Sequence, residues 1–175
     1  MTRHEYVDML AARYEAYYDV RRGALAGGKP VDLIARSLRR SEKYFLSKKI
    51  TLWAFETCVT AVVKAFDPGV TAGDVDSFCE YLKNVVNTLV EPSDERVSTV
   101  LNGVMVCCSG LDGAAASRVK RFSHTKSFSM GLRGWCHLGL IAVDLECGTV
   151  YYNRAARPYE ASHRLPDRGV RAAGN

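Results

Sequence analysis

Residues 71–92 read TAGDVDSFCEYLKNVVNTLVEP, and this stretch predicts the longest helix of the chain. Its apolar residues recur at intervals of three and four, which is the period of an amphipathic helix. Thr71 can cap the helix at its start, and Pro92 ends it. We expect one face of this helix to pack on a sheet, with the residues Val75, Phe78, Leu82, Val85, Val86 and Leu89.

The next segment, residues 97–108, reads VSTVLNGVMVCC and predicts a strand. Its second half, residues 104–108, is apolar at both odd and even positions, so the side chains on both faces would be buried. This pattern is typical of a central strand that is covered on both sides. The two segments together predict a helix that packs on a sheet.

Toward the N-terminus the sequence predicts a helix and then several strands. Thr2 can cap a helix, and Glu5, three residues later, completes a capping box. Residues 32–66 are rich in β-branched and aromatic residues, which predicts an antiparallel meander. The segment Glu56-Thr57-Cys58 is expected to form a tight turn between the last two strands of this meander.

Toward the C-terminus the elements are shorter. Asp112 can cap a short helix that runs to Val119. Residues 122–130 alternate between large and small side chains, which predicts a half-exposed strand or extended loop. Residues 138–152 predict a hairpin, in which Gly148 supplies the positive φ that the turn needs.

These elements place the chain in the α+β class, with a mainly antiparallel sheet on which two amphipathic helices and one short helix pack. The predicted domain comprises residues 1–153. Residues 154–175 are rich in Ala, Arg and Pro and are expected to be disordered or loosely attached. This tail carries three of the five net positive charges, so the folded domain is close to neutral.

Composition limits the function classes. The chain has 175 residues, of which 47% are hydrophobic, so one globular domain can form without metals or disulfides. No apolar stretch is long enough to span a membrane, and the N-terminus does not resemble a signal peptide. A cytoplasmic protein is therefore expected. Its six cysteines would then be reduced, and they lack the spacing of a zinc site. We expect no metal and no cofactor.

Several segments resemble a family of uncharacterised bacterial proteins. The resemblance spans residues 4–153 and implies a bacterial cytosolic protein, but it implies no activity and assigns no functional residue. The segments that carry it are KYFLSKK at 43–49, AFE at 54–56, KRF at 120–122, KSFSMGLRGW at 126–135, VDL at 143–145, GTV at 148–150 and Asn153.

A cationic surface is the first candidate site. Basic residues cluster in two segments, and aromatic residues lie close to them. If these segments are neighbours in the sheet, their side chains suit phosphates or single-stranded nucleic acid. The alternative is that they are solvated strand faces and protect sheet edges. The residues predicted to bind are Arg36, Lys43, Lys48, Lys126, Arg133 and Trp135. They favour a non-enzymatic binding or interaction module for an anionic ligand, a nucleic acid or a protein partner.

Two other functions stay open. A metal-assisted phosphoesterase or nuclease would need Glu56, Asp144 and Lys126 to converge in one pocket. The sequence lacks the usual nucleotide, hydrolase and zinc-protease motifs, which argues against an enzyme. A structural homodimer is the third hypothesis, because exposed strands and nine tyrosines could support edge or face pairing. His124 and His137 are interpreted as hydrogen-bonded structural residues.

Overall fold

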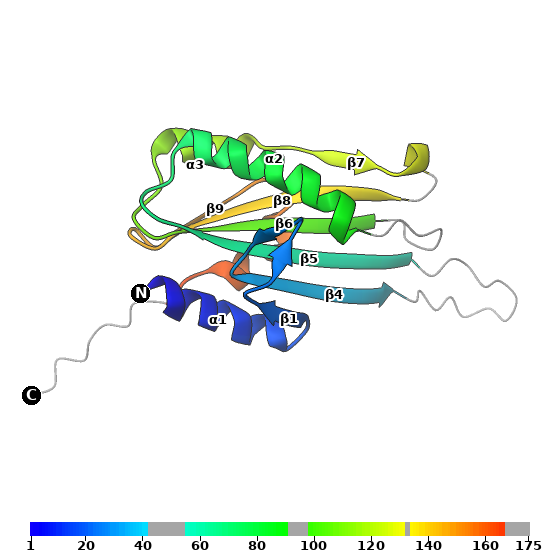
Figure 1. Ribbon diagram of the computed structural model, residues 1–175, viewed down its shortest axis with the longest axis horizontal. Helices are drawn as coiled ribbons and strands as arrows, with labels where there is room; N and C mark the ends of the chain where they lie inside the picture. The colour runs from blue at the N-terminus through cyan, green and yellow to red at the C-terminus, as the bar shows by residue number, and fades with distance from the viewer. Residues whose placement is uncertain (42–54, 91–97, 132–133, 167–175) are drawn as a thin grey trace, which may run out of the picture.

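The computed structural model describes residues 1–41, 55–90, 98–131 and 134–166 (Figure 1). The helices in this part of the chain are α1 (Arg3–Glu15), α2 (Ala72–Leu89) and α3 (Gly113–Arg121), with the 3-10 helices η1 (Ser129–Gly131) and η2 (Arg157–His163). The strands are β1 (Asp19–Arg22), β2 (Leu25–Ala26), β3 (Lys29–Pro30), β4 (Leu33–Ser41), β5 (Phe55–Phe66), β6 (Ser98–Cys107), β7 (Thr125–Ser127), β8 (Trp135–Asp144) and β9 (Thr149–Tyr152).

One seven-stranded mixed sheet forms the frame of the molecule, with the order β1-β4-β5-β6-β8-β7, and β9 pairs with β8 beyond the end of β7. The pairs β1–β4, β4–β5, β7–β8 and β8–β9 are antiparallel, whereas β5–β6 and β6–β8 are parallel. The α+β class is confirmed. The expectation of a mainly antiparallel sheet needs correction at its centre. There α2 connects the parallel strands β5 and β6, and the segment that contains α3 and β7 connects the parallel strands β6 and β8.

Local signals placed the helix starts correctly. Thr2 and Glu5 form the predicted capping box of α1. Thr71 caps α2 and completes a second box with Asp74, and Asp112 caps α3. Each cap bonds backbone N–H groups of the first turn that have no partner inside the helix.

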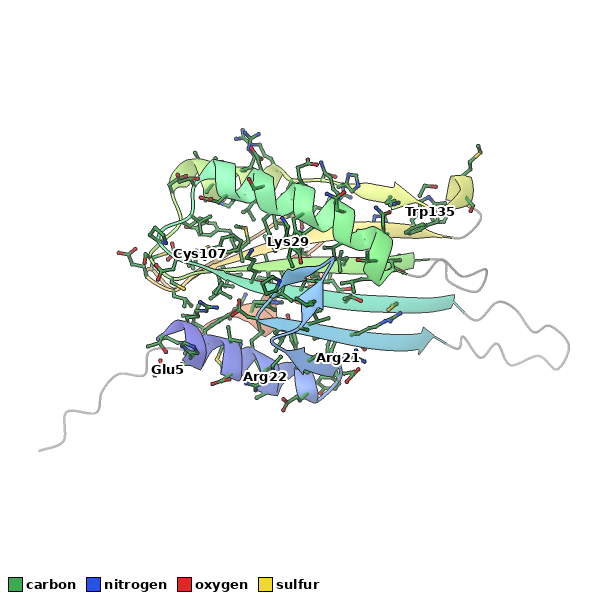
Figure 2. All side chains as sticks on the ribbon, in the orientation of Figure 1. Glu5, Arg21, Arg22, Lys29, Cys107 and Trp135 are labelled. Carbon is green, nitrogen blue, oxygen red and sulfur yellow. The ribbon has the colours of Figure 1, made fainter. Side chains whose placement is uncertain are left out.

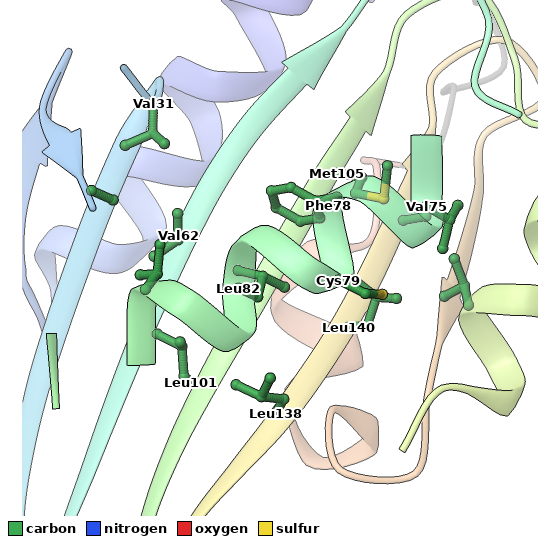
Figure 3. Close-up of a cluster of buried hydrophobic side chains, with 14 of the residues drawn as sticks. Val31, Val62, Val75, Phe78, Cys79, Leu82, Leu101, Met105, Leu138 and Leu140 are labelled. Atoms are coloured by element: carbon green, nitrogen blue, oxygen red, sulfur yellow. The ribbon is translucent and has the colours of Figure 1, made fainter. Parts of the chain in front are cut away.

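The helices α2 and α3 cover one face of the sheet, and α1 covers part of the other (Figure 1). Under α2, Phe78 and Leu82 pack against Val62, Leu101 and the apolar residues of β8 (Figure 3). The contact is so close that a Cβ atom added at Gly103 would lie 2.1 Å from a methyl group of Leu82. β6 is buried on both faces, as predicted for a central strand.

Three segments differ from their predicted structure. β5 runs without interruption through 56–58, where a turn was expected, because β4 and β6 flank it on both sides. The alternating segment 122–130 forms only the three-residue strand β7 before η1. The 3-10 helices η1 and η2 were not predicted.

The start of the expected tail is packed on the domain. In η2, His163 is 1% exposed and lies against α1. The Tyr6 hydroxyl donates to the His163 carbonyl at 2.8 Å, and Arg13 donates to the carbonyls of Ser162 and Arg164. The domain therefore extends beyond Asn153. Composition alone missed this because the contacts join residues about 150 positions apart.

None of the helices in the described part of the chain has the length and apolar character that crossing a bilayer requires.

A candidate anion-binding pocket beside Arg36

The predicted cationic surface does not assemble as one patch among the described residues. Arg36 lies in β4 and Lys126 in β7, and three strands separate them. At about 4.8 Å per strand, the two backbones are about 19 Å apart across the sheet. Lys126 donates to Asn87 on α2 and lies 5.4 Å from the centre of the Phe128 ring. Its ammonium group is therefore already engaged.

Trp135 belongs to the opposite face from Lys126. Lys126 pairs with Cys136, which is buried in the cluster beneath α2. Successive residues of a strand point to opposite faces, so the adjacent Trp135 points away from α2. Three other predicted binding residues, Lys43, Lys48 and Arg133, lie outside the described residues.

The predicted catalytic group is also dispersed. In the register, Thr57 aligns with Trp135 through β6, whereas Phe66 aligns with Asp144. Glu56 and Asp144 therefore lie at opposite ends of the sheet, about 33 Å apart along the strands at 3.3 Å per residue. The side chain of Glu56 is outside the described set, but no side chain spans that distance. These two carboxylates cannot share one metal site, so the predicted Glu56–Asp144 site does not form.

Asp144 has a structural role instead. Its Oδ2 atom accepts a hydrogen bond from the Leu111 N–H at 3.1 Å. Its Oδ1 atom accepts from the N–H groups of Glu146 at 2.9 Å and Cys147 at 3.1 Å. The buried carboxylate thus holds the β8–β9 turn and the loop before α3 together.

Arg36 lines a pocket of about 280 Å³ on the face covered by α2. In the register, Arg36 lies between Asp19 of β1 and Thr60 of β5. Side chains at paired positions share a face, so these three converge on the same hollow. Arg36 is exposed and makes no ion pair with any described carboxylate. Its guanidinium group remains available to a ligand.

Thr60 contributes a buried hydroxyl without a partner. Thr60 is 2% exposed, and its Oγ1 atom has no hydrogen-bond partner within the described structure. An unsatisfied buried polar group is unusual, because its desolvation costs about 1–3 kcal/mol. A bound ligand would provide the missing partner.

The remaining walls of the pocket are mostly apolar. Leu25, Ile34 and Leu89 come from the β2–β3 hairpin, β4 and the end of α2. The hairpin is fixed to α2, since the Tyr81 hydroxyl donates to the Ala26 carbonyl at 2.8 Å. Lys29 of the same hairpin, labelled in Figure 2, lies 5.6 Å from the Tyr81 ring centre. Leu25 is nevertheless 67% exposed, so the pocket presents apolar surface to solvent.

The charge of the pocket favours an anion. Two guanidinium groups, Arg21 and Arg36, face one carboxylate, Asp19, and the Asp19 carboxylate lies 3.6 Å from Arg21. One positive charge, that of Arg36, is left uncompensated. A guanidinium group can donate two parallel hydrogen bonds to a carboxylate or phosphate. The pocket can therefore bind an anion and shelter a small apolar group attached to it.

Comparison with protein families assigns the chain. A family model described as "Domain of unknown function (DUF8052)" matches residues 2–164. The chain belongs to this family. The predicted resemblance to a family of uncharacterised proteins is thereby confirmed, and the match includes η2, beyond the predicted boundary at Asn153.

Other comparisons add little to the family assignment. No curated protein matches the chain. Among solved structures, "MspJI Restriction Endonuclease in Complex with 27-mer Oligonucleotide" aligns with 18% identity over 65% of this chain and 22% of that one, with a TM-score of 0.26. The chain thus spans about a fifth of that protein. Such a loose overlap carries no conclusion about the function of this family member.

Sequence reasoning found Arg36 but missed the rest of the pocket. The residues 19–22 were not predicted to pair with β4, so Asp19 and Arg21 were not placed beside it. Thr60 was read as one more β-branched residue of a strand. A polar residue in the apolar run 58–63 was the available signal, but its missing partner is visible only in three dimensions.

Proposed function

We propose that the protein is a non-enzymatic binding module for a small anionic ligand that occupies the Arg36 pocket. The ligand class is a carboxylate or phosphate monoester with a compact apolar group. The observation that carries the proposal is the pairing of an uncompensated guanidinium group with a buried hydroxyl that lacks a partner, on adjacent strands.

The two polar groups have complementary roles. Arg36 supplies charge and bidentate hydrogen bonds, whereas the Thr60 hydroxyl adds one donor at the floor of the pocket. Binding is favoured because the buried hydroxyl gains the partner that it lacks. The apolar walls then select anions that carry an apolar substituent over inorganic ions. The volume of about 280 Å³ lies at the lower end for small-molecule sites, so the ligand is small.

The lining supports binding without catalysis. The described lining residues include no histidine or cysteine, and the carboxylate of Asp19 is already close to Arg21. General acid–base or nucleophilic chemistry needs an activated group beside the ligand. This pocket instead presents a fixed cation, a hydroxyl and apolar walls.

Isothermal titration calorimetry with benzoate, hexanoate and phenyl phosphate tests the proposal. Benzamide and hexanamide serve as neutral counterparts. We expect the anions to bind and the amides not to. Arg36→Gln should weaken anion binding by about tenfold or more, because a charge-assisted hydrogen bond is lost. Thr60→Val should weaken it several-fold without changing the charge.

Arg118→Gln is a charge-matched control. Arg118 pairs with Asp76 on the exposed surface of α2 and α3, away from the pocket lining. Its loss should leave anion affinity unchanged. Equal affinity for acids and amides, or equal losses in the Arg36 and Arg118 variants, would contradict the proposal.

A further inference from the structure

A second surface lies on the opposite face of the sheet, near the start of β8. Figure 2 labels Trp135 at the start of β8, close to β7. On this face, two rows of side chains run across the strands β6, β8 and β7, and each row has one residue from each strand. We call these six residues the two-row patch. The rows are Ser98, Trp135 and Ser127, followed by Val100, His137 and Thr125.

The two-row patch faces solvent and contains no charged carboxylate or lysine. All six side chains are exposed or half-buried, and Trp135 is 43% exposed. A large aromatic residue on an open sheet face, bordered by small hydroxyl residues, leaves its ring available for stacking. Bases of nucleic acids stack on such side chains irrespective of their sequence.

A pocket of about 290 Å³ adjoins the second row. Val100, Thr125 and His137 belong to both, and the other polar residues of its lining are Ser123, His124, Asn153 and Arg154. Arg154 is exposed and forms no ion pair with the described residues. The pocket therefore has one uncompensated positive charge and several hydrogen-bonding groups.

The histidine is oriented by its neighbour. The Thr125 Oγ1 atom lies 2.9 Å from His137 Nδ1. When the hydroxyl donates to Nδ1, the ring proton is on Nε2, which can then donate to an anion. Arg154, His137 and Ser123 together offer the donors that a phosphate group accepts.

We propose that this face binds one nucleotide unit, with its phosphate in the Arg154 pocket and its base on Trp135. Trp135 and His137 are two residues apart on one face of β8, about 6.7 Å along the strand. A sugar can bridge that distance between a stacked base and a bound phosphate. This site differs from the Arg36 pocket in face and residues, and its ligand carries a base and a sugar in place of a compact apolar group.

Fluorescence of Trp135 provides a direct test. The chain has two tryptophans, so Trp53→Phe leaves Trp135 as the sole reporter. The probes are AMP, adenosine, ribose 5-phosphate and a ten-residue deoxythymidine oligonucleotide. AMP should quench the emission and bind at least tenfold more tightly than adenosine or ribose 5-phosphate, since only AMP fills both parts of the site.

Variants separate the two contacts. Arg154→Gln should lower the affinity for AMP about tenfold and leave that for adenosine unchanged. Trp135→Ala should lower the affinities for AMP and for adenosine by about tenfold each, because a stacked base is lost. Calorimetry measures these affinities, since this variant lacks the fluorescent reporter. Arg157→Gln is the charge-matched control, three residues further on and outside the pocket lining. Arg36→Gln should not alter the quenching, which keeps this test independent of the first pocket.

The oligonucleotide identifies the source of the nucleotide. Affinity equal to that of AMP indicates a free nucleotide, whereas tighter binding with a steeper salt dependence indicates a single strand. Absence of quenching by AMP and by the oligonucleotide at millimolar concentration would overturn the proposal. AMP affinity that is unaffected by both Arg154→Gln and Trp135→Ala would overturn it as well.

Discussion

Two regions of the sheet differ in whether their polar side chains have hydrogen-bond partners. Beside β8, both carboxylate oxygens of Asp144 and both the amide oxygen and nitrogen of Asn153 have hydrogen-bond partners. On β4 and β5, the exposed guanidinium group of Arg36 and the buried hydroxyl of Thr60 have none among the described residues. The first pattern marks side chains that build the fold. The second is the pattern on which we base the proposed ligand site, because a buried polar group without a partner is unfavourable.

Asn153 shows how a side chain replaces missing sheet backbone. β7 borders the start of β8 and β9 borders its end, which leaves a gap near residues 138–140. In this gap Asn153 Oδ1 accepts from Leu140 and Ala156, and Nδ2 donates to Leu138 and Phe122. The family resemblance included this asparagine, and the structure supplies a physical reason for it.

The largest expected effect comes from breaking that network. Asn153→Ala should lower the free energy of unfolding by about 3–4 kcal/mol, because four hydrogen bonds are lost and buried backbone groups are left unpaired. Urea denaturation measures the change. Asn153→Asp keeps the acceptor but not the donor, so it should be destabilised as well. A loss below about 1 kcal/mol in the alanine variant would contradict the assigned role.

A smaller effect concerns pH. His163 Nδ1 lies 2.7 Å from the Tyr159 carbonyl, so it must donate, and Nε2 accepts from the Tyr14 hydroxyl at 2.6 Å. Burial lowers the pKa of His163 to about 4. This lies below the unfolded value of about 6.5, so the unfolded chain binds the proton more readily. The neutral, buried His163 therefore contributes about 3 kcal/mol to the free energy of unfolding above pH 6.5, and this contribution is lost as the pH falls toward 4.

Thermal unfolding between pH 7.5 and 4 checks this expectation. His163→Gln should have a lower unfolding temperature at neutral pH. Between pH 6.5 and 4, its unfolding temperature should fall less steeply than that of the unmodified protein, because the contribution of His163 is absent. His4→Gln, at an exposed position on α1, is the matched control and should keep the full slope. If His163→Gln keeps the full slope too, another group is responsible.

The smallest expected effect is an increase in stability, at Thr60. Thr60→Val replaces an unpartnered buried hydroxyl by a methyl group of similar size, so it should raise the free energy of unfolding by up to about 1 kcal/mol without ligand. Thr99→Val is a control at a buried threonine of the neighbouring strand whose hydroxyl is not among the unpartnered buried atoms. Chemical denaturation of both variants sharpens the comparison. A destabilised Thr60→Val would show that the hydroxyl has a structural partner.

Local chemistry explains which features could be predicted from the sequence. The caps at Thr2, Thr71 and Asp112 and the glycine turn at Gly148 depend on residues within a few positions of one another. The parallel pairs of β6 could not be predicted from its own apolar pattern, because a buried central strand looks alike in either direction. The pairing partner decides the direction, and it lies tens of residues away.

The sequence by itself supplied the α+β class and the helix starts, and it named Arg36 and Trp135 as candidate binding residues. Only the tertiary structure decided that these two residues lie on different faces and that Glu56 and Asp144 lie at opposite ends of the sheet. It also brought Asp19 and Thr60 to Arg36, and Arg154 to His137. The physical reason is that a binding site depends on strand order and register, which arise from contacts between distant residues.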